Sequence, residues 1–327
     1  MKDALAHRVI GRSSVASFFN PSASNDERIL LEIPTVLPTR LMRMILNGKS
    51  AGDPALRAAV KEIRSRGYTL EVRVTWEGGD AARYASDAVR DGVDVVIAAG
   101  GDGTVNEVVT GVLSTDDAHN TAVAVVPFGT ANDFATGCGI PIGDPLAALQ
   151  LAATGDAIAI DVGKANEDFF INVASGGFGA TVTANTPPEL KKAIGGAAYS
   201  LMGIVTAAKM SPHACRATLP DGSSHSGDML VMTIGNGRQC GGGQQVAPRA
   251  SLNDGLLDVM VIHDVDVKSF GQVLAELLTL GDESNDLVSY AQLASLKIES
   301  DEPIQVNLDG EPVSSTCFEF SIVPHAL

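Results

Sequence analysis

The chain has 327 residues, of which 45% are hydrophobic, and it carries a formal net charge of −16. One hydrophobic core seldom serves more than about 250 to 300 residues, so we expect two domains. General nucleic-acid binding is excluded because it needs clustered lysine and arginine, and the same acidity disfavours permanent residence on an anionic membrane. No apolar run reaches the length of a transmembrane helix.

The cysteines favour a reduced environment. They are widely spaced and form no CxxC pair, so the sequence predicts neither a disulfide framework nor a metal cluster. A cytoplasmic protein is the simplest interpretation, and the sequence does not indicate its oligomeric state. The cysteines are Cys138, Cys215, Cys240 and Cys317.

Residues 1–39 differ from the rest of the chain. They show no apolar periodicity, and Ser, Asn and Pro gather between Asn20 and Asn25. Their arginines are not accompanied by the apolar stretch of a signal peptide. We therefore expect a disordered extension before the folded part of the chain.

Residues 40–160 alternate between strand-like and helix-like segments. Such alternation is typical of a doubly wound parallel sheet, in which ligands bind beyond the carboxyl ends of the strands. The expected elements are a strand from Leu41 that stops at Asn47, a helix from Pro54 to Arg66, a strand from Leu70 to Trp76 and a helix from Asp80 to Arg90. One further strand begins at Val93, and another ends at Pro127.

A glycine-rich stretch follows the strand that begins at Val93. Gly100, Gly101 and Gly103 end this strand, and Thr104 with Glu107 has the spacing of a capping box at the start of a helix. A helix N terminus offers free backbone N–H groups to phosphate. We expect Gly103 to need close approach or a positive φ. A tight turn without a ligand is the alternative interpretation.

Polar residues follow each predicted strand of this region. Because parallel strands end at one edge of a sheet, we expect these residues to converge. They are Asn47 and Gly48, Thr75, Asp102 to Thr104, and the group Gly129, Thr130, Asn132 and Asp133.

From about residue 161 to 327 the pattern changes to short strand-like runs separated by Gly and Asp turns. Many strands with few helices favour an antiparallel β-sandwich. Two helices are expected, Glu189 to Met210 and Val267 to Leu280. The apolar segment Ala193 to Ala208, flanked by lysines, suits a core helix or a transient contact with a membrane surface.

The segment GGDGTVNE resembles the nucleotide loop of diacylglycerol kinases and sphingosine kinases and, more distantly, of NAD kinases and phosphofructokinases. The segments ILNGK, PFGTANDFA, INVASGGFG, IGNGRQCGGGQQVAP, LNDGLLD and NLDGEP occur with it in order. From Arg40 to Leu327 the chain thus resembles the diacylglycerol kinase catalytic family. This implies an α/β nucleotide-binding domain over 40–160 and a β-sandwich lipid-substrate domain over 161–327.

The resemblance also implies roles for individual residues. Glu311 matches the general base, and Ser251, Asp254 and Leu256 match a structural site for Mg²⁺ or Ca²⁺, in which Ser251 and Leu256 act through their carbonyls. The positions that match ATP contacts are Thr75, Gly101, Asp102, Gly103, Thr104, Val105, Asn106, Glu107 and Thr130.

The activity implied is that of a lipid kinase that uses ATP and Mg²⁺, with its active site in the cleft between the domains. Its substrate would be a membrane lipid such as diacylglycerol or a phosphatidylglycerol-like lipid. Two alternatives stay open: an NAD kinase-like enzyme that uses the same loop, and a non-catalytic module that senses nucleotide or lipid. From the residues alone, an acid in a solvated β-turn is the favoured interpretation of Glu311, and only the family resemblance reverses this preference.

Overall fold

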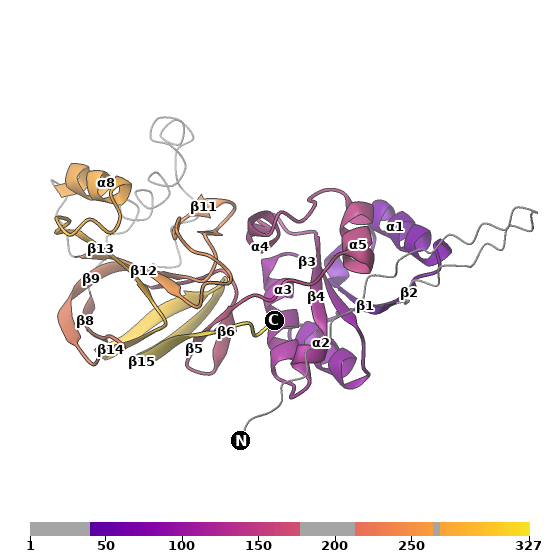
Figure 1. Cartoon of the computed structure of the whole chain (residues 1–327), viewed down its shortest axis with the longest axis horizontal. Coiled ribbons are helices and arrows are strands. Elements are labelled where there is room, and N and C mark those ends of the chain that lie inside the picture. The colour runs from indigo at the N-terminus through magenta and orange to yellow at the C-terminus, as the bar shows by residue number, and fades with distance from the viewer. Residues whose placement is uncertain (1–39, 177–212, 264–268) are drawn as a thin grey trace, which may run out of the picture. The chain divides into compact units, whose positions relative to one another are not determined.

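The computed structural model describes residues 40–176, 213–263 and 269–327 (Figure 1). Three sequence-based predictions lie outside these residues and are not tested: the disordered extension over 1–39, the helix from Glu189 to Met210, and the segment from Ala193 to Ala208 as a membrane contact.

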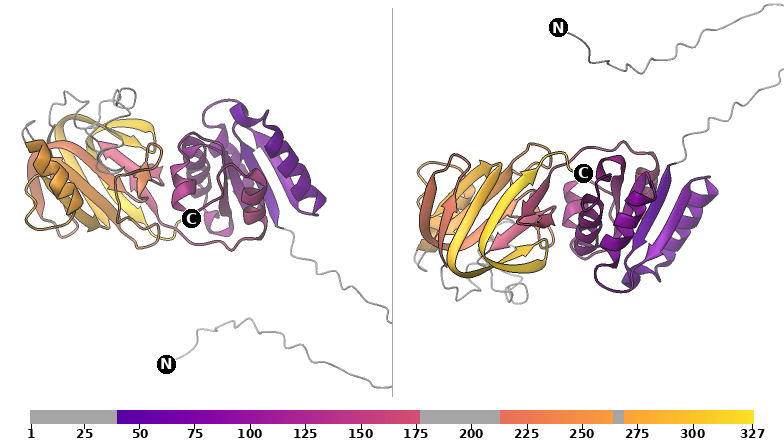
Figure 2. Two further views of the ribbon diagram at one scale, coloured as in Figure 1. Left: turned by 90° about the horizontal axis from the view of Figure 1, so that it is seen from above. Right: turned by 90° about the horizontal axis from the view of Figure 1, so that it is seen from below.

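The first part of the chain forms a four-stranded parallel sheet in the order β2-β1-β3-β4. The central strands β1 and β3 are buried because helices cover both faces of the sheet, as a parallel sheet requires (Figure 2). This confirms the predicted parallel α/β architecture. The strands are β1 (Leu41–Leu46), β2 (Thr69–Val74), β3 (Val95–Gly100) and β4 (Ala122–Pro127).

Five α-helices accompany the described part of this sheet: α1 (Pro54–Ser65), α2 (Asp80–Arg90), α3 (Asp102–Leu113), α4 (Asp133–Gly137) and α5 (Pro145–Thr154). Short 3₁₀ turns occupy Gly48–Ser50 and Ala118–Asn120. Helix α1 begins where expected, since Asp53 accepts a hydrogen bond from the Leu56 N–H at 2.8 Å and Pro54 follows it.

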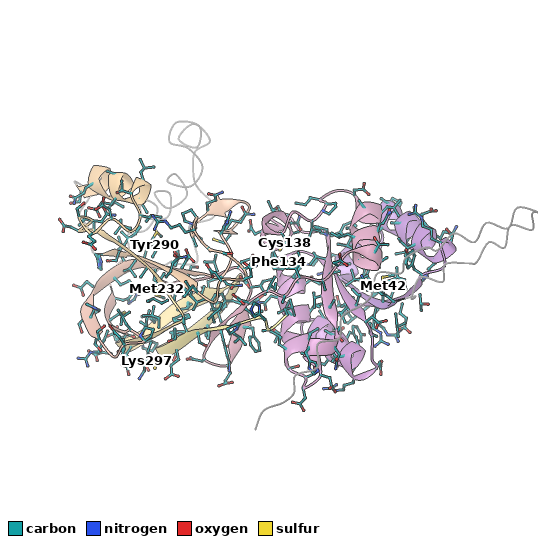
Figure 3. All side chains as sticks on the ribbon, viewed as in Figure 1. Met42, Phe134, Cys138, Met232, Tyr290 and Lys297 are labelled. Atoms are coloured by element: carbon teal, nitrogen blue, oxygen red, sulfur yellow. The ribbon has the colours of Figure 1, made fainter. Side chains whose placement is uncertain are left out.

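The alternation of side chains along β1 places apolar groups on both faces of the sheet. Met42 and Met44 pack with Ile63 of α1 and Leu149 of α5 on one face, and Figure 3 labels Met42 in this layer. Ile45 packs on the other face with residues of α2 and α3. Burial on both faces explains why β1 is apolar except for Arg43.

The second part of the chain forms a nine-stranded antiparallel sheet. Its order is β13-β12-β9-β7-β14-β15-β5-β6, and β8 pairs with β14 and β9. The predicted antiparallel sandwich class is confirmed. The strands are β5 (Val162–Ala165), β6 (Asp168–Phe170), β7 (Val173–Gly176), β8 (His213–Thr218), β9 (Ser224–Gly235), β12 (Leu257–His263), β13 (Val288–Leu293), β14 (Ser295–Leu308) and β15 (Glu311–Val323).

The core of this sheet is built from large apolar side chains, among them Phe170, Met232, Phe318 and Phe320, and Met232 is labelled in Figure 3. A short hairpin of β10 (Gln239–Cys240) and β11 (Gln244–Gln245) stands apart from it. Strand β14 continues without a break through residue 300. Its pairing with β15 is merely irregular between Glu299 and Ile304.

Helix α8 (Phe270–Leu278) lies within the helix predicted from Val267 to Leu280. Its Glu276 is buried, and the carboxylate accepts hydrogen bonds from the N–H groups of Leu287 at 2.7 Å and Val288 at 2.8 Å. The Gln272 amide donates a further bond at 2.8 Å. Glu276 therefore fixes the loop between α8 and β13.

We expect Glu276→Gln to lower the free energy of unfolding by about 1 to 3 kcal/mol at neutral pH, because buried N–H groups lose a charged acceptor. Burial raises the pKa of Glu276, but the donors outweigh burial and the pKa lies below its ordinary value. The stabilisation is therefore present above the ordinary glutamate pKa and is lost as the pH falls through the folded-state pKa. Urea unfolding of both proteins should show a difference that shrinks in acid, and a constant difference would contradict this account.

Candidate active site

The carboxyl ends of the parallel strands carry polar groups that contact one another. After β1, the Asn47 side-chain amide donates to the Thr104 hydroxyl at 3.1 Å, and the Gly48 N–H donates to the Thr75 hydroxyl at 3.2 Å. After β3 and β4, the Phe128 N–H donates to the Gly100 carbonyl at 2.8 Å. The predicted convergence of strand ends is therefore observed.

Two glycines allow the loops after β3 and β4 to touch. A Cβ atom on Gly101 would lie 2.9 Å from the Gly129 Cα, which is closer than carbon atoms pack. Asn132 holds the second loop in shape with a left-handed φ of 53°: its side chain accepts from the Gly129 N–H at 2.8 Å and donates to the Gly129 carbonyl at 2.8 Å. Thr130 is exposed on this loop.

Helix α3 starts earlier than the sequence predicts. Its first residue is Asp102 and its N-cap is Gly101, which has no side chain to make a capping bond. The predicted capping box is wrong, because Thr104 lies inside the helix and the Glu107 carboxylate instead accepts from the Gly79 N–H at 3.1 Å. The positive φ suggested for Gly103 is also wrong, and an added Cβ there meets no protein atom within 4 Å. Close approach of a nucleotide to Gly103 stays a prediction.

Because α3 begins at Asp102, the backbone N–H groups that are free to bind a ligand belong to the first residues of the helix. The first N–H groups of a helix have no intrahelical acceptor, so those of Asp102, Gly103 and Thr104 are available to an anion. Val105 offers less, because its N–H donates to the Gly101 carbonyl at 3.1 Å and its side chain is buried in the core.

Asp102 organises the loop. It is half-buried, and its Oδ1 accepts from the Phe134 N–H at 3.1 Å, which joins the start of α4 to the start of α3. A carboxylate repels a phosphate but suits a hard cation, so this position favours organising or cation-binding roles over direct contact with phosphate.

Asp133, the last residue of the predicted convergent group, is buried at the start of α4. Its carboxylate accepts from the N–H groups of Gly242 at 2.9 Å and Gly243 at 2.6 Å, and its carbonyl accepts from the Gln239 side chain at 3.1 Å. These bonds hold the β10–β11 hairpin against α4. A cavity of about 240 Å³ lies beside them, lined by Asp133, Phe134, Asn172, Arg238, Ser251 and other residues.

Cys240 of this hairpin is an inert thiol. Burial, with the nearby charges of Asp133 and Asp309, raises its pKa to about 12. A thiol with so high a pKa is not a thiolate nucleophile at neutral pH.

Glu311 is the first residue of β15 and is exposed. It follows a two-residue turn in which Asp309 has a φ of 49° and Gly310 a φ of 110°, as the type I′ hairpin turn requires. The Asp309 carboxylate accepts from the N–H groups of residues 171, 172 and 173 at 2.6, 3.0 and 2.9 Å. It also accepts from the Asn106 amide of α3 at 3.0 Å.

The segment Ser251 to Leu256 is held by hydrogen bonds to a buried acid, Asp161. The Asp161 carboxylate accepts from the Gly255 N–H at 2.7 Å, and the Asp161 N–H donates to the Leu252 carbonyl at 2.6 Å. Asp254 accepts from the Leu256 N–H at 3.1 Å. Within the described ranges, no hydrogen bond joins this segment to the glycine loop, although Ser251 lines the same cavity as Phe134.

The donor set of this segment fits a hard cation, because one carboxylate and two carbonyls are all oxygen ligands. No group of three or more His, Cys, Asp or Glu side chains suited to a metal occurs in the part of the chain that the structure describes. A cation here would thus depend on the carbonyls and on water.

Residues 42–165 match the diacylglycerol kinase catalytic domain, and residues 172–327 match the YegS C-terminal NAD kinase beta sandwich-like domain. A "Probable lipid kinase YegS-like" protein of Chromohalobacter salexigens is 45% identical over 87% of this chain and 91% of its own length. The chain belongs to the YegS-like group of the diacylglycerol kinase catalytic family. A protein of the same name from Yersinia pseudotuberculosis is 44% identical over 87% of this chain and 94% of its own.

Solved structures agree with this family assignment. The crystal structure of a "putative diacylglycerol kinase" from Bacillus anthracis is 27% identical to this member of the family and superposes with a TM-score of 0.72. The match covers 88% of this chain and 95% of that chain.

The sequence did not indicate that the Asp309 carboxylate of this family member binds distant residues. The sequence indicated only a turn at Asp309 and Gly310, whereas the structure gives Asp309 four donors. Burial raises its pKa, and these donors oppose the rise. The available sign was the Asp-Gly pair between two apolar strands, which predicts the hairpin but not the partners of its carboxylate.

Because the two glycine loops touch at Gly101, we expect the stability of the fold to depend strongly on this residue. We expect Gly101→Ala to lower the free energy of unfolding by about 1 to 3 kcal/mol, because overpacking forces the two backbones apart. The matched control is Gly103→Ala, two residues on, where the structure leaves space. Thermal unfolding of both variants provides the measurement, and equal melting temperatures would show that the loops do not need this contact.

Proposed function

We propose that this family member transfers the γ-phosphate of ATP to a hydroxyl of a membrane lipid, with Glu311 as the general base, in the cleft between its two domains. Its family makes it a lipid kinase. We further propose the class of lipid, the identity of the base and the position of the site in the cleft.

One observation carries the proposal: the 3.0 Å hydrogen bond from Asn106 to Asp309. Asn106 belongs to the helix that begins at the glycine loop, and Asp309 belongs to the turn that precedes Glu311. A proposed phosphate site and a proposed base therefore belong to two elements in direct contact. General base catalysis needs this proximity, because the base must reach the attacking hydroxyl.

In this mechanism the loop holds the donor. The N–H groups of Asp102, Gly103 and Thr104 would bind phosphate oxygens at the start of α3, and Thr75 and Thr130 would contribute hydroxyls. Phosphoryl transfer has a loose transition state with charge on the transferred oxygens, so fixed donors supply much of the catalysis. Glu311 would accept the proton of the lipid hydroxyl as the oxygen attacks.

Asp102 would hold Mg²⁺ beside the phosphates, and its bond to the Phe134 N–H fixes the carboxylate for that purpose. When bound, the cation neutralises charge that develops on the phosphate oxygens. Ser251, Asp254 and Leu256 would hold a second, structural cation, either Mg²⁺ or Ca²⁺, through the oxygens described above.

The proposed acceptor is a lipid with a glycerol-type hydroxyl, either diacylglycerol or a phosphatidylglycerol-like lipid. The protein would meet it through transient contact with a membrane surface. Among the described residues, no helix is long and apolar enough to cross a bilayer.

A panel of lipids tests the proposal. The protein is incubated with labelled ATP, Mg²⁺ and mixed micelles that contain diacylglycerol, phosphatidylglycerol or a lipid without a free hydroxyl. We expect label in one of the first two and none in the third. Hydrolysis of ATP without any labelled lipid would contradict a lipid kinase.

A further inference from the structure

Asn106 is tied to the protein by both of its side-chain N–H groups. Its amide nitrogen lies 3.2 Å from the Phe169 carbonyl and 3.0 Å from the Asp309 carboxylate. A side-chain amide has two N–H donors, so none is left for a phosphate while these bonds exist. The side chain therefore connects α3 to the segment before β7 and to the β14–β15 turn.

Asp309 is fixed in both its backbone and its side chain. The φ of 49° belongs to the left-handed region, which Asp tolerates in tight turns, and Gly310 continues the turn with a φ of 110°. The carboxylate accepts four hydrogen bonds, which is about the capacity of its two oxygens. The turn thus has one position relative to residues 171–173 and to Asn106.

Glu311, by contrast, has no side-chain restraint. In the described parts of the chain, neither a hydrogen bond nor an ion pair involves its carboxylate, and the residue is exposed. Its location depends on the backbone of the hairpin, where it pairs with Leu308. Whatever fixes the Asp309 turn therefore also fixes Glu311.

We propose that Asp309 and Asn106 form a positioning pair that aligns Glu311 with the N terminus of α3. This inference rests on the proposed role of Glu311 as base. Neither residue needs to touch the lipid, because the pair acts through the backbone of the hairpin. Small displacements matter in such an arrangement, since a shift of about 1 Å at a reacting group costs on the order of 10² in rate.

The test is a set of double-mutant cycles. Asp309→Asn keeps the size of the side chain but removes its charge and one acceptor. Asn106→Ala removes the bonds from α3 to Asp309 and to the Phe169 carbonyl and leaves three donors on Asp309. Each is measured alone and combined with Glu311→Gln for kcat, ATP affinity and melting temperature. Glu276→Gln is the matched control, because it also removes charge from a buried acid that accepts backbone N–H groups, but it lies on α8.

We expect Asp309→Asn and Asn106→Ala to lower kcat by about 10- to 100-fold when Glu311 is present. With Glu311→Gln in place, neither change should lower kcat by more than about threefold, because the positioned group is already absent. Glu276→Gln should lower the melting temperature and leave kcat at the wild-type value.

Failure of the positioning pair and failure of the proposed base give different results. If Glu311→Gln is slow but Asp309→Asn and Asn106→Ala turn over at the wild-type rate, the positioning pair is wrong and the base stands. Effects that multiply fully with Glu311→Gln would also overturn the pair, because they would act independently of Glu311. If Glu311→Gln itself has the wild-type rate, the proposed base is wrong and the pair has nothing to position. Should Asp309→Asn not fold, Asn106→Ala alone decides the question.

Discussion

Replacing Glu311 by Gln should reduce turnover by about 10² to 10⁴ and leave the fold and ATP affinity unchanged. Glutamine keeps the size of the side chain and removes the group that accepts the hydroxyl proton. Glu311 is exposed, and within the described ranges its carboxylate makes no hydrogen bond or ion pair that the change would break, so no loss of stability is expected. Proton transfer is late in a loose transition state, so the loss could lie near the lower figure.

The measurement is kcat on a working lipid, with melting temperature and ATP dissociation constant measured alongside. Glu302→Gln is the control, because Glu302 is an exposed acid in the neighbouring strand β14. A folded Glu311→Gln protein with wild-type turnover would reduce Glu311 to a turn residue.

The second large effect is expected at Asp102. Asp102→Asn retains an oxygen that can accept from the Phe134 N–H, so the joint between α3 and α4 should persist. The charge that would hold Mg²⁺ is lost. A catalytic cation stabilises the transition state by several kcal/mol, and we expect turnover to fall by roughly 10² to 10³.

This variant should also need more Mg²⁺ for half-maximal activity, which a titration of rate against Mg²⁺ measures. Asp116→Asn, at an exposed acid beyond the end of α3, is the control. An unchanged Mg²⁺ requirement together with unchanged turnover would leave Asp102 as a purely structural acceptor.

The sequence predicts the sheet well because its signals are local. The strand from Val95 to Gly100 is a continuous apolar run, and Asp53 followed by Pro54 is a standard helix start. The error at Thr104 arose because Gly101 adopts an extended backbone conformation, which lets α3 begin two residues before Thr104. Asp301, Glu302 and Pro303 are exposed and would suit a turn, but pairing with β15 on either side of them carries β14 through.

The contacts at the candidate site are not local. The backbone N–H groups that Asp309 binds lie 136 to 138 positions away from it in the sequence. Its fourth donor, Asn106, lies 203 positions away. No periodicity or capping rule reports such pairs. The sequence therefore indicated the residues around the glycine loop, because each follows a predicted strand, but it did not show that Asp309 connects that loop's helix to the turn before Glu311.

The most direct test of the account is a competition between acceptors in one reaction. The protein is given ATP labelled at the γ-phosphate, Mg²⁺, NAD and micelles that contain diacylglycerol and phosphatidylglycerol, and the products are separated and counted. We predict label in a lipid and none in NAD, and lipid label lower by about 10² or more with Glu311→Gln. Labelled NAD with unlabelled lipids would contradict the assignment of a lipid substrate.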